Sequence, residues 1–213
     1  MFDNFNLLAT LQMLPAIVIG LTVHEFAHAY AAYKCGDYTA KEMGRLSLNP
    51  LRHIDPIGFA LIVFVGFGWA KPVAFNEYHL KNKDADTIKI AAAGPLSNAV
   101  LAIIFSGIFV LIAKNIPETA LDAYSFFIGM LYYGIIVNWG LFVFNLIPLP
   151  PLDGSHVFLS RCKNHPSYRS LEKWGVVILF ATLFIQSQTS LDILPIGPVV
   201  RFLSDISLKV FGL

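Results

Sequence analysis

The chain carries little charge. Only 14% of its 213 residues are Asp, Glu, Lys or Arg, whereas a soluble domain usually contains about 25%, and the net charge is +1. This composition argues against a cytosolic enzyme, a disordered protein and a nucleic-acid-binding protein. Cysteine is scarce as well. Cys35 and Cys162 form neither a CxxC pair nor a disulfide framework, so we interpret both as ordinary apolar residues.

Long hydrophobic runs stand in place of the missing charge. A membrane-spanning helix needs about 20 largely apolar residues. Four runs between charged clusters reach about that length, at about residues 7–33, 88–113, 124–147 and 174–190. A fifth run, 56–70, is shorter and rich in glycine, which suits a re-entrant or membrane-surface segment. No lysine or arginine precedes the first run, which also contains ionisable residues, so we expect it to be a membrane span and not a cleaved signal peptide.

Basic residues predict how the chain is oriented. Segments 34–52, 71–89 and 161–173 each contain four lysines or arginines, whereas segment 114–122 has one lysine against two acidic residues. The three basic segments should therefore face the cytoplasm. We expect a multi-pass protein of the cell membrane with its N-terminus outside. The first and third spans then run inward, and the second and fourth run outward.

The remaining segments complete the predicted fold. Residues 45–50 and 71–76 are short, interrupted by proline and extended in propensity, so we expect two strands of a small sheet at the cytoplasmic face. The tail, 192–213, mixes apolar and charged residues and predicts an interfacial helix. The predicted fold class is an all-α polytopic integral membrane protein of about four to six transmembrane helices. It includes the re-entrant segment and the small membrane-associated β-sheet, and residues 1–213 form a single domain with a core at 7–160.

Three ionisable residues lie together in the first run, where each costs about 2.5–3.5 kcal/mol at the centre of a bilayer. They form an HExxH motif, His24-Glu25-Phe26-Ala27-His28. On a helix the two histidines stand one above the other and can share a metal ion. Glu25 can reach a metal-bound water without ligating the metal. The alternative is a satisfied pair of core histidines beside a chance glutamate.

A catalytic zinc site usually takes a third protein ligand. Asp153 is the best candidate, because it lies in a proline-rich segment, 145–154, whose freed backbone groups need partners inside the protein. Its alternative role is to cap the following helix. His28 and Asp153 both lie towards the cytoplasmic ends of inward-running spans, so the ligands can meet at one depth. The other candidates are His53, Asp55, His79, His156 and His165.

Taken together, these residues resemble the site-2 protease family of intramembrane metalloproteases, in particular its compact prokaryotic branch close to the sporulation factor protease. The resemblance covers roughly residues 7–160. It rests on motifs in order: HEFAHAY at 24–30, LNPL at 48–51, HIDPIG at 53–58, GWAKPV at 68–73 with Asn76, AGPLSN at 93–98, and the segment 145–154. It implies a zinc endopeptidase that cleaves membrane protein substrates within or near their transmembrane helices. We expect no PDZ or CBS domain beside this core.

The resemblance also implies roles for individual residues. Zinc (Zn2+) would be held by His24, His28 and Asp153, with Glu25 as the catalytic base and Asn145 facing the site to hold the substrate or its oxyanion. Asn98, in the GPxxN motif, either bonds between helices or lines the site and contacts substrate. The two extended segments could receive the substrate as an added strand. Their residues with this expected role are Arg45, Leu46, Ser47, Leu48, Lys71, Pro72 and Val73.

Two other functions compete with proteolysis. A metal-ion transporter would need a ladder of ligands along its pathway, but the second and fourth spans carry no ionisable residue between their ends. A non-catalytic pseudoprotease that binds partner helices fits the fold but does not explain Glu25. The expected partners are a transmembrane protein substrate and membrane lipid, without nucleic acid. A second copy of the chain or a regulatory membrane protein stays open as a further partner.

Overall fold

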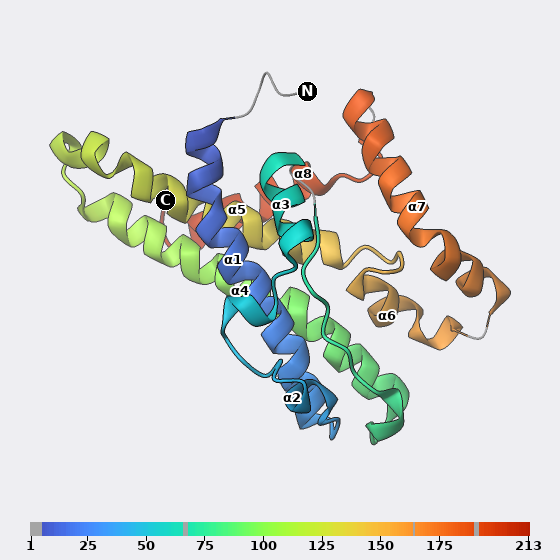
Figure 1. The fold of residues 1–213 in the computed structure, drawn as a ribbon. Helices are drawn as coiled ribbons and strands as arrows, with labels where there is room; N and C mark the ends of the chain where they lie inside the picture. The colour runs from blue at the N-terminus through green and yellow to red at the C-terminus, as the bar shows by residue number, and fades with distance from the viewer. Residues whose placement is uncertain (1–5, 66–67, 164, 190–191) are drawn as a thin grey trace.

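Helices make up most of the computed structural model, which describes residues 6–65, 68–163, 165–189 and 192–213 (Figure 1). The α-helices are α1 (Leu7–Lys34), α2 (Thr39–Glu42), α3 (Pro56–Val65), α4 (Lys83–Asn115), α5 (Leu121–Asn145), α6 (Asp153–Leu159), α7 (Pro166–Gln188) and α8 (Ile196–Val210). Short 3-10 turns lie at η1 (Pro50–Arg52), η2 (Glu77–His79), η3 (Glu118–Ala120) and η4 (Ser160–Cys162).

Four helices, α1, α4, α5 and α7, are long and apolar enough to cross a membrane. They correspond to the four hydrophobic runs, and the prediction of a helical membrane protein is confirmed. Helix α7 begins at Pro166, well before the predicted run at 174, with His165 as its N-cap. Its first turns are polar, with Arg169 and Glu172, and a hydropathy pattern detects only the later ones.

Helices α1, α4 and α5 pack together and form the core, and α1 crosses the other two in Figure 1. Small residues permit this close packing. A Cβ added at Gly20 on α1 would lie 2.9 Å from Leu141 Cδ1 on α5, and one at Gly134 on α5 would lie 2.5 Å from Phe105 Cδ1 on α4. Without a hydrophobic driving force in lipid, such close approach stabilises a helix pair through van der Waals contact.

The tail forms a helix, α8, one side of which packs on α4 and α5. Val200 joins the buried cluster of Ala102 and Trp139. The hydroxyl of Ser207 lies 2.8 Å from Ser106 Oγ and accepts a 3.3 Å hydrogen bond from Trp139 Nε1. Polar bonds of this kind hold helices together in an apolar surrounding. The tail therefore forms a helix, as the sequence predicts, and one side of it packs on the helical core.

The expected small β-sheet is wrong, because the residues that the structure describes contain no strand. Segments 45–50 and 71–76 meet only through side chains and one neighbouring bridge. Ile54 pairs with Ala70 in a single antiparallel bridge, and Lys71 N donates to His53 O over 2.7 Å. The Arg45 side chain, not its backbone, donates to the Lys71 carbonyl. Prolines in both segments remove ladder donors, so the single bridge, the Lys71–His53 backbone bond and the Arg45 side chain connect the segments in place of a sheet.

The same bridge brings the two ends of the short run 56–70 together. Helix α3 begins at Pro56, just after Ile54, and Ala70, which follows the helix in the chain, pairs with Ile54. A segment that begins and ends at one place suits the predicted re-entrant or surface role, while residues 66 and 67 of this run lie outside the described residues.

Asp37 ties the end of α1 to the segment that precedes α4. Its carboxylate is fully buried and accepts hydrogen bonds from Thr39 N and Oγ1, from Asn76 N over 2.7 Å, and from His79 Nδ1 over 3.0 Å. Burial favours the protonated acid, but these hydrogen bonds outweigh burial and hold the pKa of Asp37 below its usual range. Asp37 thus fixes the 71–76 segment against α1.

Candidate active site

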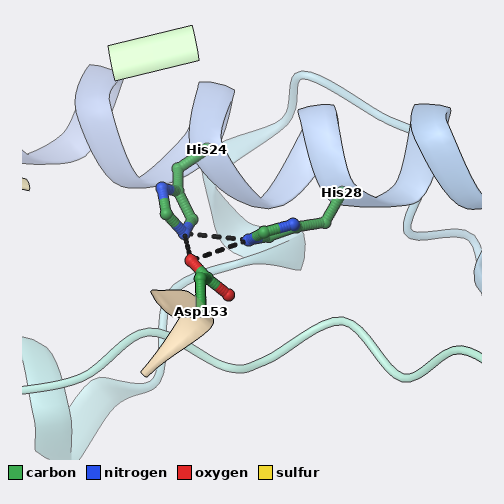
Figure 2. A group of neighbouring side chains, drawn as sticks. All are labelled: His24, His28 and Asp153. Atoms are coloured by element: carbon green, nitrogen blue, oxygen red, sulfur yellow. Dashed lines mark hydrogen bonds and ion pairs between the residues drawn. The ribbon is translucent and has the colours of Figure 1, made fainter. Parts of the chain in front are cut away.

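His24, His28 and Asp153 meet although they are far apart in the sequence (Figure 2). The two histidines lie one turn apart on α1, with their Nε2 atoms 3.0 Å apart. Asp153, the first residue of α6, places Oδ2 3.2 Å from His24 Nε2 and 3.3 Å from His28 Nε2. Among the described residues, no other group of three such side chains comes together. His53, Asp55, His79, His156 and His165 lie outside this group.

Hydrogen bonds on the far side of each ring define where the histidine protons lie. His28 Nδ1 lies 2.7 Å from the carbonyl of Ile90, which can only accept, so this nitrogen carries the proton. His24 Nδ1 lies 2.7 Å from Asn98 Oδ1. The amide NH2 of Asn98 faces two acceptors, the Gly20 carbonyl and Asn138 Oδ1, each at 3.1 Å, so its oxygen must face His24. Both rings therefore have a protonated Nδ1.

The three atoms that face one another are then all electron-pair donors. In neutral imidazoles with a protonated Nδ1, Nε2 carries a lone pair. Asp153 Oδ2 is buried and has no hydrogen-bond donor within the described protein. Two nitrogen lone pairs and a carboxylate oxygen within 4.8 Å repel one another unless a proton or a metal ion lies between them. Two histidines and one carboxylate are also an ordinary ligand set of catalytic zinc.

Gly94 on α4 provides the space for the two rings. A Cβ at this position would lie 2.3 Å from His28 Nε2 and 2.7 Å from His24 Cε1, far inside normal contact distance. The fully buried Asn98 lies one turn further along α4. The GPxxN motif thus places a residue without a side chain beside the rings and an amide behind one of them.

The turn before α6 presents Asp153. Leu152, not Asp153, is the N-cap of α6, and no side chain caps this helix. The carboxylate is therefore turned towards the histidines instead of the helix end, which disfavours the capping alternative. A Cβ at Gly154 would lie 2.3 Å from the Leu146 carbonyl, so only glycine permits this packing of α6 against the end of α5.

Glu25 lies beside the cluster and is only 7% exposed. Its Oε2 accepts a 2.9 Å hydrogen bond from Val73 N and lies 4.0 Å from Arg45 Nη2. Burial lowers the pKa of Arg45, while the charge of Glu25 opposes this shift, and a guanidinium stays protonated in either case. Burial also lowers the pKa of His53, and the neighbouring Arg45 charge adds to that effect. Glu25 therefore faces a cation and a backbone donor.

Several expected site residues have other partners. Asn145 ends α5 and donates its amide to the Leu141 carbonyl over 2.9 Å. Asn98 is fully buried, its Oδ1 faces His24 Nδ1, and its NH2 group faces the Gly20 carbonyl and Asn138 Oδ1. Sequence reasoning missed Asn138, which is fully buried and bonds Asn98. An amide inside an apolar run is the signal that could have identified it.

The other expected substrate-binding residues lie in the two loop segments. Arg45 is buried beside Glu25, and Leu48 is 60% exposed. The remaining members are Leu46, Ser47, Lys71, Pro72 and Val73, none of which lies in a strand.

Comparison with known proteins adds independent information. The profile of Peptidase family M50 matches residues 12–186. A protein of Bacillus subtilis (strain 168), provisionally named zinc metalloprotease YwhC, is 39% identical over 212 residues, which cover 95% of this chain and 93% of the relative. One of Methanocaldococcus jannaschii, provisionally named zinc metalloprotease MJ0611, is 31% identical over 156 residues, 73% of each chain. Another of Mycolicibacterium smegmatis, provisionally named zinc metalloprotease Rip2, is 29% identical over 78% of this chain and 64% of the relative. No solved structure matches the chain significantly.

Proposed function

The chain belongs to peptidase family M50, the site-2 protease family, and we propose that His24, His28 and Asp153 hold the zinc ion on which its activity depends. The protein is an intramembrane zinc metalloprotease that acts on membrane proteins. The observation that carries the proposed ligand set is the convergence of two imidazole lone pairs and one carboxylate oxygen that lacks a donor. A metal-ion transporter and a non-catalytic helix-binding protein are not favoured.

Different residues around this cluster carry out the steps of peptide hydrolysis. A bound zinc ion supplies a Lewis acid that activates water and polarises the scissile carbonyl. Glu25 takes the proton of the attacking water and passes it to the leaving amide nitrogen. The Val73 N–H holds one oxygen of Glu25 during both transfers. Asn98 and the Ile90 carbonyl keep the two histidines in the tautomer that directs Nε2 towards the metal.

Asn145 is proposed to stabilise the oxyanion. Its amide now bonds Leu141, and rotation of the side chain would free the NH2 group for a substrate. Loss of one oxyanion donor typically costs about 2.7–4 kcal/mol of transition-state stabilisation. Asn145→Ala should therefore lower kcat by about 100-fold or more without loss of zinc.

The substrate is proposed to bind in an extended form. A helical segment hides its carbonyls in its own hydrogen bonds, so it must unwind before hydrolysis. The 71–75 segment has no regular secondary structure and lies against Glu25 through Val73, which suits an added substrate strand. We place this site towards the cytoplasm and the N-terminus outside, because the basic loops gather at the end of the bundle where α1 stops and α4 begins. Lys163 and Glu77, from two of these loops, form an ion pair.

Glu25→Gln tests the proposal directly. The protein purified in detergent should contain about one zinc per chain and cleave one or more members of a panel of single-span substrates, and a chelator should abolish cleavage. Glu25→Gln should keep the zinc and lose cleavage, whereas Asp153→Ala should lose both. Well-folded protein that contains no zinc and cleaves no substrate would contradict the proposal.

A further inference from the structure

A buried arginine lies beside the carboxylate that we assign as the general base. Arg45 follows α2 and is only 4% exposed. Its Nη2 lies 4.0 Å from Glu25 Oε2, and the same nitrogen donates a hydrogen bond to the Lys71 carbonyl. A guanidinium so far from solvent is costly unless its charge is matched, and Glu25 is the anion that faces it. The arginine and the glutamate are thus buried as a pair.

The 71–73 backbone connects Arg45 to Glu25 a second time. Val73 N donates to the same oxygen of Glu25 that faces the guanidinium. Only Pro72, whose ring fixes φ, separates Val73 from the carbonyl that Arg45 holds. The N–H of Lys71 is itself bound to the His53 carbonyl at 2.7 Å. Movement at Lys71 is therefore transmitted to the donor that holds Glu25.

We propose that Arg45 is a positioning residue for the general base. Its guanidinium donates a hydrogen bond to the Lys71 carbonyl and so fixes the 71–73 backbone. The Val73 N–H of this backbone holds Oε2 of Glu25, and the second carboxylate oxygen can meet the attacking water. This inference rests on the proposed role of Glu25. It also replaces the expectation that Arg45 belongs to a substrate-binding strand, because the side chain points into the protein rather than towards a free strand edge.

Kinetic constants separate positioning from substrate binding. A displacement of about 1 Å at a catalytic group can cost about 100-fold in rate. Arg45→Ala should therefore lower kcat by about 100-fold, with KM within about threefold of the wild type and zinc retained. Arg45→Lys keeps the charge but loses the planar fork, so its kcat should lie between the two. Arg52→Ala, which removes the same charge from an exposed position on the same loop, is the matched control and should keep full kcat.

A second pair of variants tests the connection through the backbone. Val73→Pro removes the N–H that holds Glu25, whereas Val73→Ala retains it. The kcat of Val73→Pro should fall well below that of Val73→Ala, because only the proline variant lacks this N–H. If Arg45 acts through this segment, the Arg45→Ala/Val73→Pro double variant should lose little more than the worse single variant, because both remove one interaction. Multiplicative losses would overturn the inference.

Zinc content and thermal midpoint are measured for every variant. A wild-type kcat in Arg45→Ala, beside an inactive Glu25→Gln, would overturn the positioning role and leave the proposed function intact. An active Glu25→Gln would instead overturn the proposed function. If Arg45→Ala does not fold, Arg45→Lys and the Val73 pair decide: wild-type kcat in Arg45→Lys together with equal kcat in Val73→Pro and Val73→Ala contradicts the inference.

Discussion

Replacing Gly94 with alanine should remove the zinc site without unfolding the protein. The new Cβ would lie 2.3 Å from His28 Nε2 and 2.7 Å from His24 Cε1. Ordinary contacts of a Cβ begin at 3.4 Å, so the His28 ring must retreat by about 1.1 Å, the difference between 3.4 and 2.3 Å. The atom that moves is the one that we assign to the metal. Since loss of an outer-shell partner alone costs about 10- to 100-fold in metal affinity, displacement of a ligand should cost at least 100-fold.

Helix propensity favours the variant, so a loss of zinc cannot be attributed to a weakened α4 helix. Alanine in a helix interior is favoured over glycine by about 1 kcal/mol, so the backbone of α4 should not be weakened. Gly140→Ala is the matched control, because this glycine also lies in a long helix, α5, and an added Cβ there meets nothing within 4 Å. We expect Gly140→Ala to bind zinc and cleave substrate normally.

The assay is zinc affinity by competition with a chromogenic chelator, together with substrate cleavage and the thermal midpoint in detergent. Gly94→Ala should show weakened zinc binding and little cleavage while remaining folded. Wild-type zinc affinity and cleavage in Gly94→Ala would contradict this prediction, because the rings could then not occupy the positions that the structure gives them.

Three further predictions concern the polar contacts around the core. Asn98→Ala should lower zinc affinity by about 10- to 100-fold, since it removes the partner of His24 Nδ1, and a competition titration measures this. Asp37→Ala should lower the free energy of unfolding by about 2–3 kcal/mol in a detergent denaturation series, because it breaks hydrogen bonds to a buried carboxylate. The lowered pKa of Asp37 means that its contribution is present at neutral pH and is lost as the pH falls through and below the ordinary range of an aspartate. Ser207→Val should cost about 1 kcal/mol of stability through the lost bond to Ser106 and leave the zinc content unchanged.

Local patterns in the sequence predict much of the fold and the zinc site. Length and hydropathy identify the four spans, because both are properties of consecutive residues. The HExxH spacing predicts that two imidazoles share one face of α1, since i and i+4 meet on any helix. Asp153 is predicted as the third ligand because the prolines around it free backbone groups, which need partners inside the protein. The structure brings this residue to both histidines.

What the sequence could not predict depends on contacts between distant segments. The sequence around Arg45 predicts a strand. In the structure the Arg45 side chain, and not a backbone ladder, bonds the Lys71 carbonyl. The sequence favours a role of Asn98 in bonding between helices over one in lining the site, but it does not show the three partners that the structure gives this amide. The pattern of the tail predicts a helix, but it does not reveal that the buried side of this helix brings Ser207 to Ser106.

X-ray absorption at the zinc edge of the purified protein identifies the atoms that ligate the metal. We expect one zinc per chain with nitrogen and oxygen ligands at about 2.0–2.2 Å, the scattering signature of two imidazoles, and no sulfur. Asp153→Ala should weaken or abolish this signal. A sulfur ligand at about 2.3 Å, or zinc binding that is unchanged after the loss of Asp153, would contradict the assignment of His24, His28 and Asp153 as the metal site.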